Sequence, residues 1–150
     1  MSISIQFCDG PLPRGLAVRP AAVASDAAGA DICFEGIVRA LENGHAITAL
    51  HYEIYEPMAT RALHFLASEV VQQFGLIHLH AAHSRGRVPV GQCSFRLRIA
   101  AAHRAEALHA MAVFIDRLKR DVPIWKSPVN AAGNPLPAGP GAAASGCEIT

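Results

Sequence analysis

Residues 93–121, CSFRLRIAAAHRAEALHAMAVFIDRLKRD, contain the change of hydrophobic period that decides the fold class. Over 93–101 apolar and polar side chains alternate, as they do in a strand with one solvated face. Beyond this segment the apolar residues recur at helical spacing, and Pro123 would end the helix. The helical stripe consists of Leu108, Met111, Ile115 and Leu118. The stretch therefore predicts a strand over 93–101 followed closely by a helix over 104–121.

The same patterns predict the remaining elements. Strands are expected over 2–7, 30–38, 47–55 and 76–83, with a short helix near 20–28. A second helix would begin at Pro57 and be capped by Gly75. Its apolar stripe would contain Met58, Ala62, Phe65, Leu66, Val70 and Phe74. Asn43-Gly44 favours a tight hairpin, and a turn is expected over 86–91. Because the loops between neighbouring strands are short, we expect antiparallel pairing and the α+β class.

Composition limits the kind of protein this can be. A chain of 150 residues that is 51% hydrophobic and 17% charged fits one folded domain, not a disordered chain. Its net charge of +1 gives no field that would attract nucleic acid, and no apolar run reaches the length of a membrane span. We expect a single domain over 1–127 and a mobile tail over 128–150 that is rich in Ala, Gly and Pro.

Cysteine usage and the N-terminus suggest a location. Cys8, Cys33, Cys93 and Cys147 form no CxxC pair, and the first ten residues lack the basic region of a secretory signal. We therefore expect reduced thiols and a cytoplasmic location.

Lys119 and Lys126 are the only lysines, whereas the chain has eleven arginines. Lys119 follows Leu118 at the edge of the helical stripe, where a lysine can serve as a general acid or base or as a nucleophile. Trp125 beside Lys126 offers a rigid wall for a flat ring. The alternative is a basic helix end that complements the helix dipole on a solvated face.

Two further segments are candidates for binding an anion. Arg39 ends the strand over 30–38, and a bend at Gly36 would be needed to turn its side chain to the face of Phe34. His103 and Arg104 stand where a strand passes into a helix, a place where backbone N–H groups favour anions. Each could instead be an ordinary solvated residue.

His78-x-His80-x-x-His83 could begin a zinc site, because two of the three side chains would share one strand face. No acid or cysteine follows at a spacing that would complete the site. We therefore expect these histidines to bind no metal. The alternative is a metal-dependent enzyme that uses all three of them.

Taken in order, these motifs resemble the large, catalytic subunit family of molybdopterin synthase, over roughly 29–126. The resemblance is carried by Gly29-Ala30, Phe34-x-Gly36-x-Val38-Arg39, Leu50-x-Tyr52-Glu53-x-Tyr55-x-x-Met58-Ala59, His83, Gly86, Gly91, Ala102-His103-Arg104-x-x-Ala107 and Asp116-x-Leu118-Lys119-x-x-x-Pro123-Ile124-Trp125-Lys126. It implies an α/β-hammerhead fold with an additional antiparallel β-sheet. It also implies a homodimer within a heterotetramer that contains two ubiquitin-like small subunits.

The resemblance implies a sulfurtransferase that needs no cofactor of its own. The small subunit would carry a C-terminal thiocarboxylate and give its sulfur to cyclic pyranopterin monophosphate, forming the dithiolene of molybdopterin. Lys119 and Lys126 would be catalytic. Substrate binding would fall to Phe34, Arg39, His103 and Arg104.

Three departures from the family pattern keep a second hypothesis open. Ser84 displaces an arginine that usually follows the histidine, Ser127-Pro128 replace a basic and an acidic residue, and 128–150 contain no basic residue. A degenerate paralogue that binds a ubiquitin-like partner without catalysis would show such changes.

Overall fold

One long strand, β6 (His78–Pro89), organises the computed structural model, which describes residues 1–14 and 26–136. Its first part pairs in parallel with β1 (Ser2–Asp9) on one side and antiparallel with β7 (Cys93–Ala101) on the other. Its last part pairs antiparallel with β5 (Ala49–Ile54). The single strand therefore joins two parts of the sheet that would otherwise be separate.

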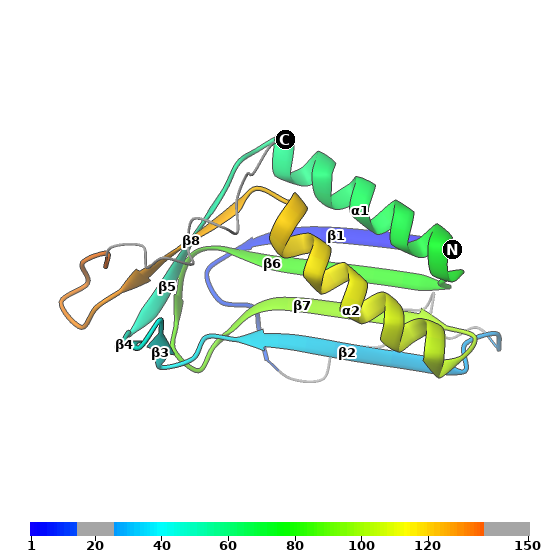
Figure 1. Ribbon diagram of the computed structural model, residues 1–150, viewed down its shortest axis with the longest axis horizontal. Helices are drawn as coiled ribbons and strands as arrows, with labels where there is room; N and C mark the ends of the chain where they lie inside the picture. Colours follow the sequence, from blue (N-terminus) through cyan, green and yellow to red (C-terminus); the bar gives the residue numbers. More distant parts are fainter. Residues whose placement is uncertain (15–25, 137–150) are drawn as a thin grey trace.

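The sheet has the order β2-β7-β6-β5-β8, with β1 attached to β6. The strands at the two ends of this order are β2 (Ala30–Ile37) and β8 (Ile124–Val129). β3 (Leu41–Glu42) and β4 (His45–Ala46) form a small separate hairpin. α1 (Met58–Phe74) and α2 (Arg104–Asp121) lie side by side over one face of the sheet (Figure 1). The mixed but mainly antiparallel pairing confirms the predicted α+β class.

The core lies between the two helices and the sheet, and most of the predicted stripe residues pack in or against it, but Met58, Phe65 and Leu108 do not. The buried side chains of α1 are Ala59, Leu63, Leu66, Ala67, Val70 and Val71. Met58 and Phe65, which were predicted to be in the stripe, are 61% and 64% exposed. Leu108 of α2 is 56% exposed, and Ala107, Ala110 and Phe114 are buried in its place. Alanines, which the predicted stripes left out except for Ala62, thus form part of the buried face of both helices.

Several boundaries follow the sequence patterns closely. β7 and α2 begin and end where predicted, and Gly75 caps α1 in the left-handed conformation with φ of 61°. The Asn43-Gly44 hairpin is confirmed, since both residues have positive φ, 50° and 78°.

The turn predicted over 86–91 is wrong in its first half. Gly86 has φ of 84° but stays in β6, which continues to Pro89 because residues 86–89 pair with β5. The chain turns only after Pro89, with Gly91 at φ of 82°. A glycine that bends a strand and one that ends it look the same in a sequence.

β8 continues past the boundary predicted after Ser127, and Pro128 and Val129 are buried. The backbone N–H of Leu136 donates to the carbonyl of Pro128 at 2.8 Å, so the chain turns back along β8.

The helix predicted near 20–28 falls mostly outside the described residues, as do 137–150. Neither helix in the described part of the chain is long and apolar enough to cross a bilayer.

Candidate active site

A cavity of about 410 Å³ opens where the C-terminal end of α2 meets the edge of the sheet. Its lining includes Lys119 from α2, Lys126 from β8 and Arg39 from the segment after β2. Phe34 lines it as well. Four residues that the sequence suggested for one site, from three distant segments, thus meet in one place.

The two lysines reach the cavity for different reasons. α2 buries Leu118 in the core, and this leaves the next residue, Lys119, exposed at the rim. On β8 the side chains alternate, so Lys126 faces the cavity while Trp125 does not line it. The flat wall expected from Trp125 is therefore wrong for this cavity. The ring that does line it near the rim belongs to Phe34, which is 39% exposed.

The bend required at Gly36 is present. The pairing of β2 with β7 shifts register between Gly36 and Ile37, which marks a β-bulge. Past the bulge Val38 is buried, its N–H donating to the carbonyl of Gln92 at 3.0 Å. The bulge supplies the bend on which this position of Arg39 depended, and Arg39 lines the same cavity as Phe34.

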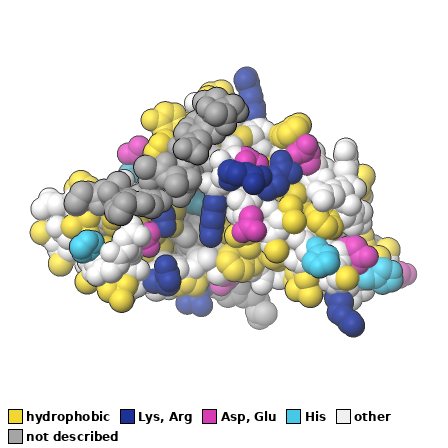
Figure 2. Space-filling view, in the orientation of Figure 1, with side chains coloured by type: hydrophobic (Ala, Val, Ile, Leu, Met, Phe, Trp, Pro, Cys, Tyr) yellow, Lys and Arg dark blue, Asp and Glu magenta, His cyan; other side chains and the backbone are white. Residues whose placement is uncertain are grey.

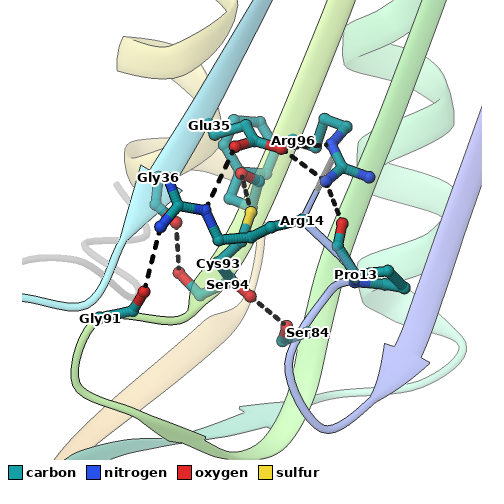
Figure 3. A network of polar contacts seen from close by, with 10 residues as sticks. Pro13, Arg14, Glu35, Gly36, Ser84, Gly91, Cys93, Ser94 and Arg96 are labelled. Carbon is teal, nitrogen blue, oxygen red and sulfur yellow. Dashed lines mark hydrogen bonds and ion pairs between the residues drawn. The ribbon is translucent and has the colours of Figure 1, made fainter. Parts of the chain in front are cut away.

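A polar network fixes this bend from the side (Figure 3). The guanidinium of Arg96 donates to the Glu35 carboxylate at 2.5 and 3.0 Å and to the carbonyl of Pro13. Arg14 forms an ion pair with the same carboxylate at 3.8 Å and donates to the carbonyl of Gly91 at 3.5 Å. The network thereby ties the residue before the bulge to the turn between β6 and β7.

The floor of the cavity is polar but uncharged. Tyr52 donates from its hydroxyl to Ser94 Oγ at 3.1 Å, and its ring meets that of His83 edge-on at 5.0 Å. Ser94 Oγ donates onward to the carbonyl of Gly36 at 3.4 Å. Burial raises the pKa of the Tyr52 phenol, which therefore stays protonated. Sequence alternation placed Ser94 on a solvated face; it is buried because Tyr52 and the bulge cover it.

His83 completes this floor as a neutral imidazole. Burial lowers its pKa to about 4, although a hydrogen bond to the carbonyl of Ser84 works in the opposite direction. Because a carbonyl can only accept, the bond of 2.8 Å requires a proton on Nδ1. The cavity therefore combines a neutral floor with basic groups above it.

An acid that the sequence did not suggest lies among the basic groups. Glu42, from the β3–β4 hairpin, accepts a hydrogen bond from Lys126 Nζ at 2.5 Å. Its only sequence signal was membership of the Glu42-Asn43-Gly44 turn, which says nothing about a contact 84 positions away.

His103 and Arg104 do not join this cavity. They stand exposed at the N-terminal end of α2, whereas Lys119 is near its C-terminal end. At 1.5 Å per residue, about 22 Å of helix separates Arg104 from Lys119. Within one chain, the predicted anion-binding pair and the lysines belong to different places.

The histidines on β6 do not converge on a metal. His78 and His80 lie on one face of the strand, where their Nδ1 atoms are hydrogen-bonded to Ser2 at 2.6 Å and Ser4 at 3.1 Å. His83 points to the opposite face. Among residues 1–14 and 26–136, no three His, Cys, Asp or Glu side chains are grouped closely enough to hold a metal ion.

Charged side chains are spread over the surface and do not gather in one basic region on the face shown in Figure 2. On the face seen in Figure 2, basic and acidic side chains are interspersed with hydrophobic ones, with no broad basic patch. With a net charge of +1, any attraction for an anion must come from local groups such as those in the cavity.

The fold and the cavity define a class of protein: a small α+β domain with basic side chains gathered over a neutral, partly aromatic pocket. Comparison with known proteins gives the family. The chain belongs to the MoaE protein family, whose sequence profile matches residues 15–121. This confirms the resemblance that the motifs suggested.

Curated relatives carry the name molybdopterin synthase catalytic subunit. The protein from Arabidopsis thaliana is 38% identical over 111 residues, covering 74% of this chain and 56% of the relative. The one from Thermoplasma volcanium is 36% identical over 107 residues, covering 71% of this chain and 78% of the relative. Against several of these relatives, including the human one at 57%, the match spans little more than half of their length.

Solved structures confirm the fold. Molybdopterin synthase from Staphylococcus aureus matches with a TM-score of 0.69 and 28% identity, covering 78% of this chain and 85% of that one. A complex of subunits 1 and 2 of the molybdopterin-converting factor from Helicobacter pylori matches with a TM-score of 0.71 and 27% identity. Each chain is covered to 88% in that second comparison.

Proposed function

We propose that this chain is the catalytic subunit of a molybdopterin synthase, a sulfurtransferase that converts cyclic pyranopterin monophosphate into the dithiolene of molybdopterin. The observation that carries the proposal is the cavity itself. It gathers Lys119, Lys126 and Arg39 around one pocket, although they come from separate elements of the fold.

The cavity suits the proposed substrate, which is an anion with a flat ring system. Arg39 and the lysines can form charge-assisted hydrogen bonds with a phosphate. Phe34 and Phe95, whose ring centroids are 6.2 Å apart, offer apolar surface to the rings. Neutral polar groups on the floor, such as Tyr52 and Ser94, can bond to ring substituents without adding charge.

The proposed sulfur donor is the C-terminal thiocarboxylate of a ubiquitin-like small subunit, whose tail would enter the cavity. In each transfer a new carbon–sulfur bond replaces a carbon–oxygen bond of the substrate, whose oxygen stays on the phosphate or leaves as water. The carbon–sulfur bond of the thiocarboxylate breaks, and water adds to the acyl group to return the tail to a carboxylate. Proton transfers and an acyl intermediate are steps that Lys119 and Lys126 can serve. These two lysines, both of which line the cavity, can therefore fill the proton-transfer and acyl-carrier roles that the proposal needs.

His103 and Arg104 fit the proposal only if the chain is a homodimer. They cannot reach the lysines of their own chain along about 22 Å of helix. In a symmetric dimer, one subunit can present its helix start to the cavity of the other. We propose such a dimer, with a small subunit bound to each chain to make a heterotetramer in the cytoplasm.

Reconstitution tests this function directly. The chain is mixed with cyclic pyranopterin monophosphate and a thiocarboxylated small subunit, and the gain of two sulfur atoms is followed by mass spectrometry. The control is the same small subunit ending in an ordinary carboxylate, which should transfer none. Turnover by the wild-type chain is the expected result.

The same experiment distinguishes the proposed enzyme from the second hypothesis, a paralogue that binds the small subunit without catalysis. Ser127 and Pro128 lie in β8, and neither is among the residues that line the cavity, which favours the catalytic hypothesis. Tight binding of the small subunit without any turnover would instead identify a non-catalytic paralogue. If the chain neither binds the small subunit nor shows turnover, both hypotheses are contradicted.

A further inference from the structure

The ion pair between Glu42 and Lys126 sets one lysine apart from the other. Nζ of Lys126 lies 2.5 Å from Glu42 Oε1. The carboxylate side chain is only 12% exposed, while that of Lys126 is 38% exposed. Among the cavity-lining residues within 1–14 and 26–136, Glu42 is the only acid, and no ion pair joins Lys119 to an acid in these ranges.

The backbone holds Glu42 in this place. The β3–β4 hairpin closes through Asn43 and Gly44, both at positive φ, and Glu42 pairs with His45 across it. The N–H of Ile47 donates to the carbonyl of Ala40 at 3.0 Å, which fixes the base of the hairpin. The segments flanking the hairpin are anchored by the buried side chains Val38, Ile47, Leu50, Tyr52 and Val88, which form one cluster. Glu42 is therefore presented from an anchored turn.

Lysine needs such a partner more than arginine would. Its flexible four-carbon chain ends in an ammonium that is a point charge with no preferred direction, whereas the planar fork of an arginine is already organised for its hydrogen bonds. Without a partner, Lys126 could turn its Nζ out of the cavity into water. The carboxylate also acts on the floor, since the negative charge of Glu42 contributes to the raised pKa of Tyr52.

We propose that Glu42 is a positioning residue, whose carboxylate fixes the Lys126 ammonium over the cavity for the reaction on the anionic substrate. This inference rests on the proposed function for its catalytic meaning. The contact between the two side chains stands independently of it. Glu42 itself acts through Lys126 and need not touch the substrate.

The first test measures the contact without using activity. Because the chain has only two lysines, competitive acetylation followed by mass spectrometry gives a separate rate for each. In Glu42→Gln, Lys126 should react roughly threefold faster, as expected for loss of a partly exposed ion pair. Lys119 should keep its rate and serves as the internal reference.

A matched control uses Glu53, an acid on β5, the strand that pairs with β8. Glu53 is exposed on β5 and does not line the cavity, so Glu53→Gln should change neither lysine's rate. An unchanged Lys126 rate in Glu42→Gln, or an equal rise at both lysines, would overturn the proposed contact. Thermal melting of both variants checks that the fold is intact.

The second test measures the positioning role. In the reconstituted assay, Glu42→Gln should lower kcat by roughly tenfold with little change in KM, as expected for a misplaced catalytic group. Glu42→Asp, which keeps the charge, should recover part of the loss. In a Lys126→Ala background Glu42→Gln should have no further effect, because the two residues act as one unit.

The outcomes separate the two proposals. A wild-type chain without turnover removes the proposed function, and acetylation still decides whether Glu42 holds Lys126. A wild-type chain with turnover, combined with full kcat in Glu42→Gln or an additive loss in the double variant, overturns the positioning role alone. A purely structural role would lower the melting temperature and reduce activity equally in both backgrounds.

Discussion

The two ends of α2 carry similar chemistry but stand in very different surroundings. At the C-terminal end, Lys119 borders a cavity that also contains Lys126 and Arg39. At the N-terminal end, His103 and Arg104 are exposed and line no part of it. The difference shows that one chain assembles only the lysine half of the predicted site. Basic residues near a helix start become part of that site only if a second subunit supplies them.

The largest effect is expected at the lysine end. Replacing Lys119 by alanine should lower turnover by about a thousandfold, since it removes a proton-transfer group or nucleophile. The melting temperature should barely change, because the side chain is exposed. Arg120→Ala, one position further along the helix and 72% exposed in its side chain, is the matched control. Wild-type-like turnover in Lys119→Ala would remove the residue from the mechanism.

A second prediction concerns the floor beneath the lysines. The folded-state pKa of His83 is about 4, below the ordinary value of 6.5, so between these values the unfolded chain binds more protons. Stability should therefore fall as pH is lowered from about 6.5 to 4, and His83 should account for roughly 3 kcal/mol of this fall.

Urea denaturation at several pH values measures this effect. Burial also lowers the pKa values of His78 and His80, so the comparison must be made between wild type and His83→Gln. The His83→Gln variant should have a lower free energy of unfolding than the wild type at neutral pH, and this free energy should fall less when the pH is lowered. Equal pH dependence in the two proteins would show that His83 is not a buried neutral base.

A third prediction sharpens the assignment of the anion. Arg39→Ala should raise KM for the pyranopterin by roughly tenfold to a hundredfold, the usual range for one hydrogen bond to a charged group. Arg87 is exposed on β6 and does not line the cavity, so Arg87→Ala should leave this KM unchanged. Steady-state kinetics at two salt concentrations will distinguish this local effect from general attraction, which salt screens. A change in kcat alone would place Arg39 elsewhere in the mechanism.

The smallest expected effect is in the polar floor. Tyr52→Phe removes the hydrogen bond to Ser94 but leaves Ser94 its acceptor at Gly36. The loss in unfolding free energy should be about 1 kcal/mol. A loss several times larger would mean that the Tyr52 hydroxyl anchors more of the cavity than this one bond.

Local patterns predicted much of this structure. The bounds of β7 and α2 and the Asn43-Gly44 hairpin followed from residues near one another in the chain, whereas Gly36 marked only where a bend was needed. The buried face of α1 did not, because the choice between Phe65 and Leu66 depends on what the helix packs against.

Features of the site that depend on distant contacts were beyond the sequence. Glu42 meets Lys126 only because the hairpin folds beside β8, and Ser94 is buried only because Tyr52 reaches it. The separation of Arg104 from Lys119, by contrast, follows from the predicted helix over 104–121, which carries both residues. Residue type predicted the chemistry of the site, whereas three-dimensional position decided which residues share it.

The comparison of the two ends of α2 is tested most directly by subunit complementation. Lys119→Ala and Arg104→Ala chains, each inactive or weak alone, are unfolded, mixed in equal amounts and refolded before the reconstituted assay. Random pairing makes half of the dimers mixed, and each mixed dimer has one intact site, so about a quarter of wild-type turnover should return. No recovery, in a mixture shown to contain mixed dimers, would contradict the account that one subunit's helix start completes the cavity of the other.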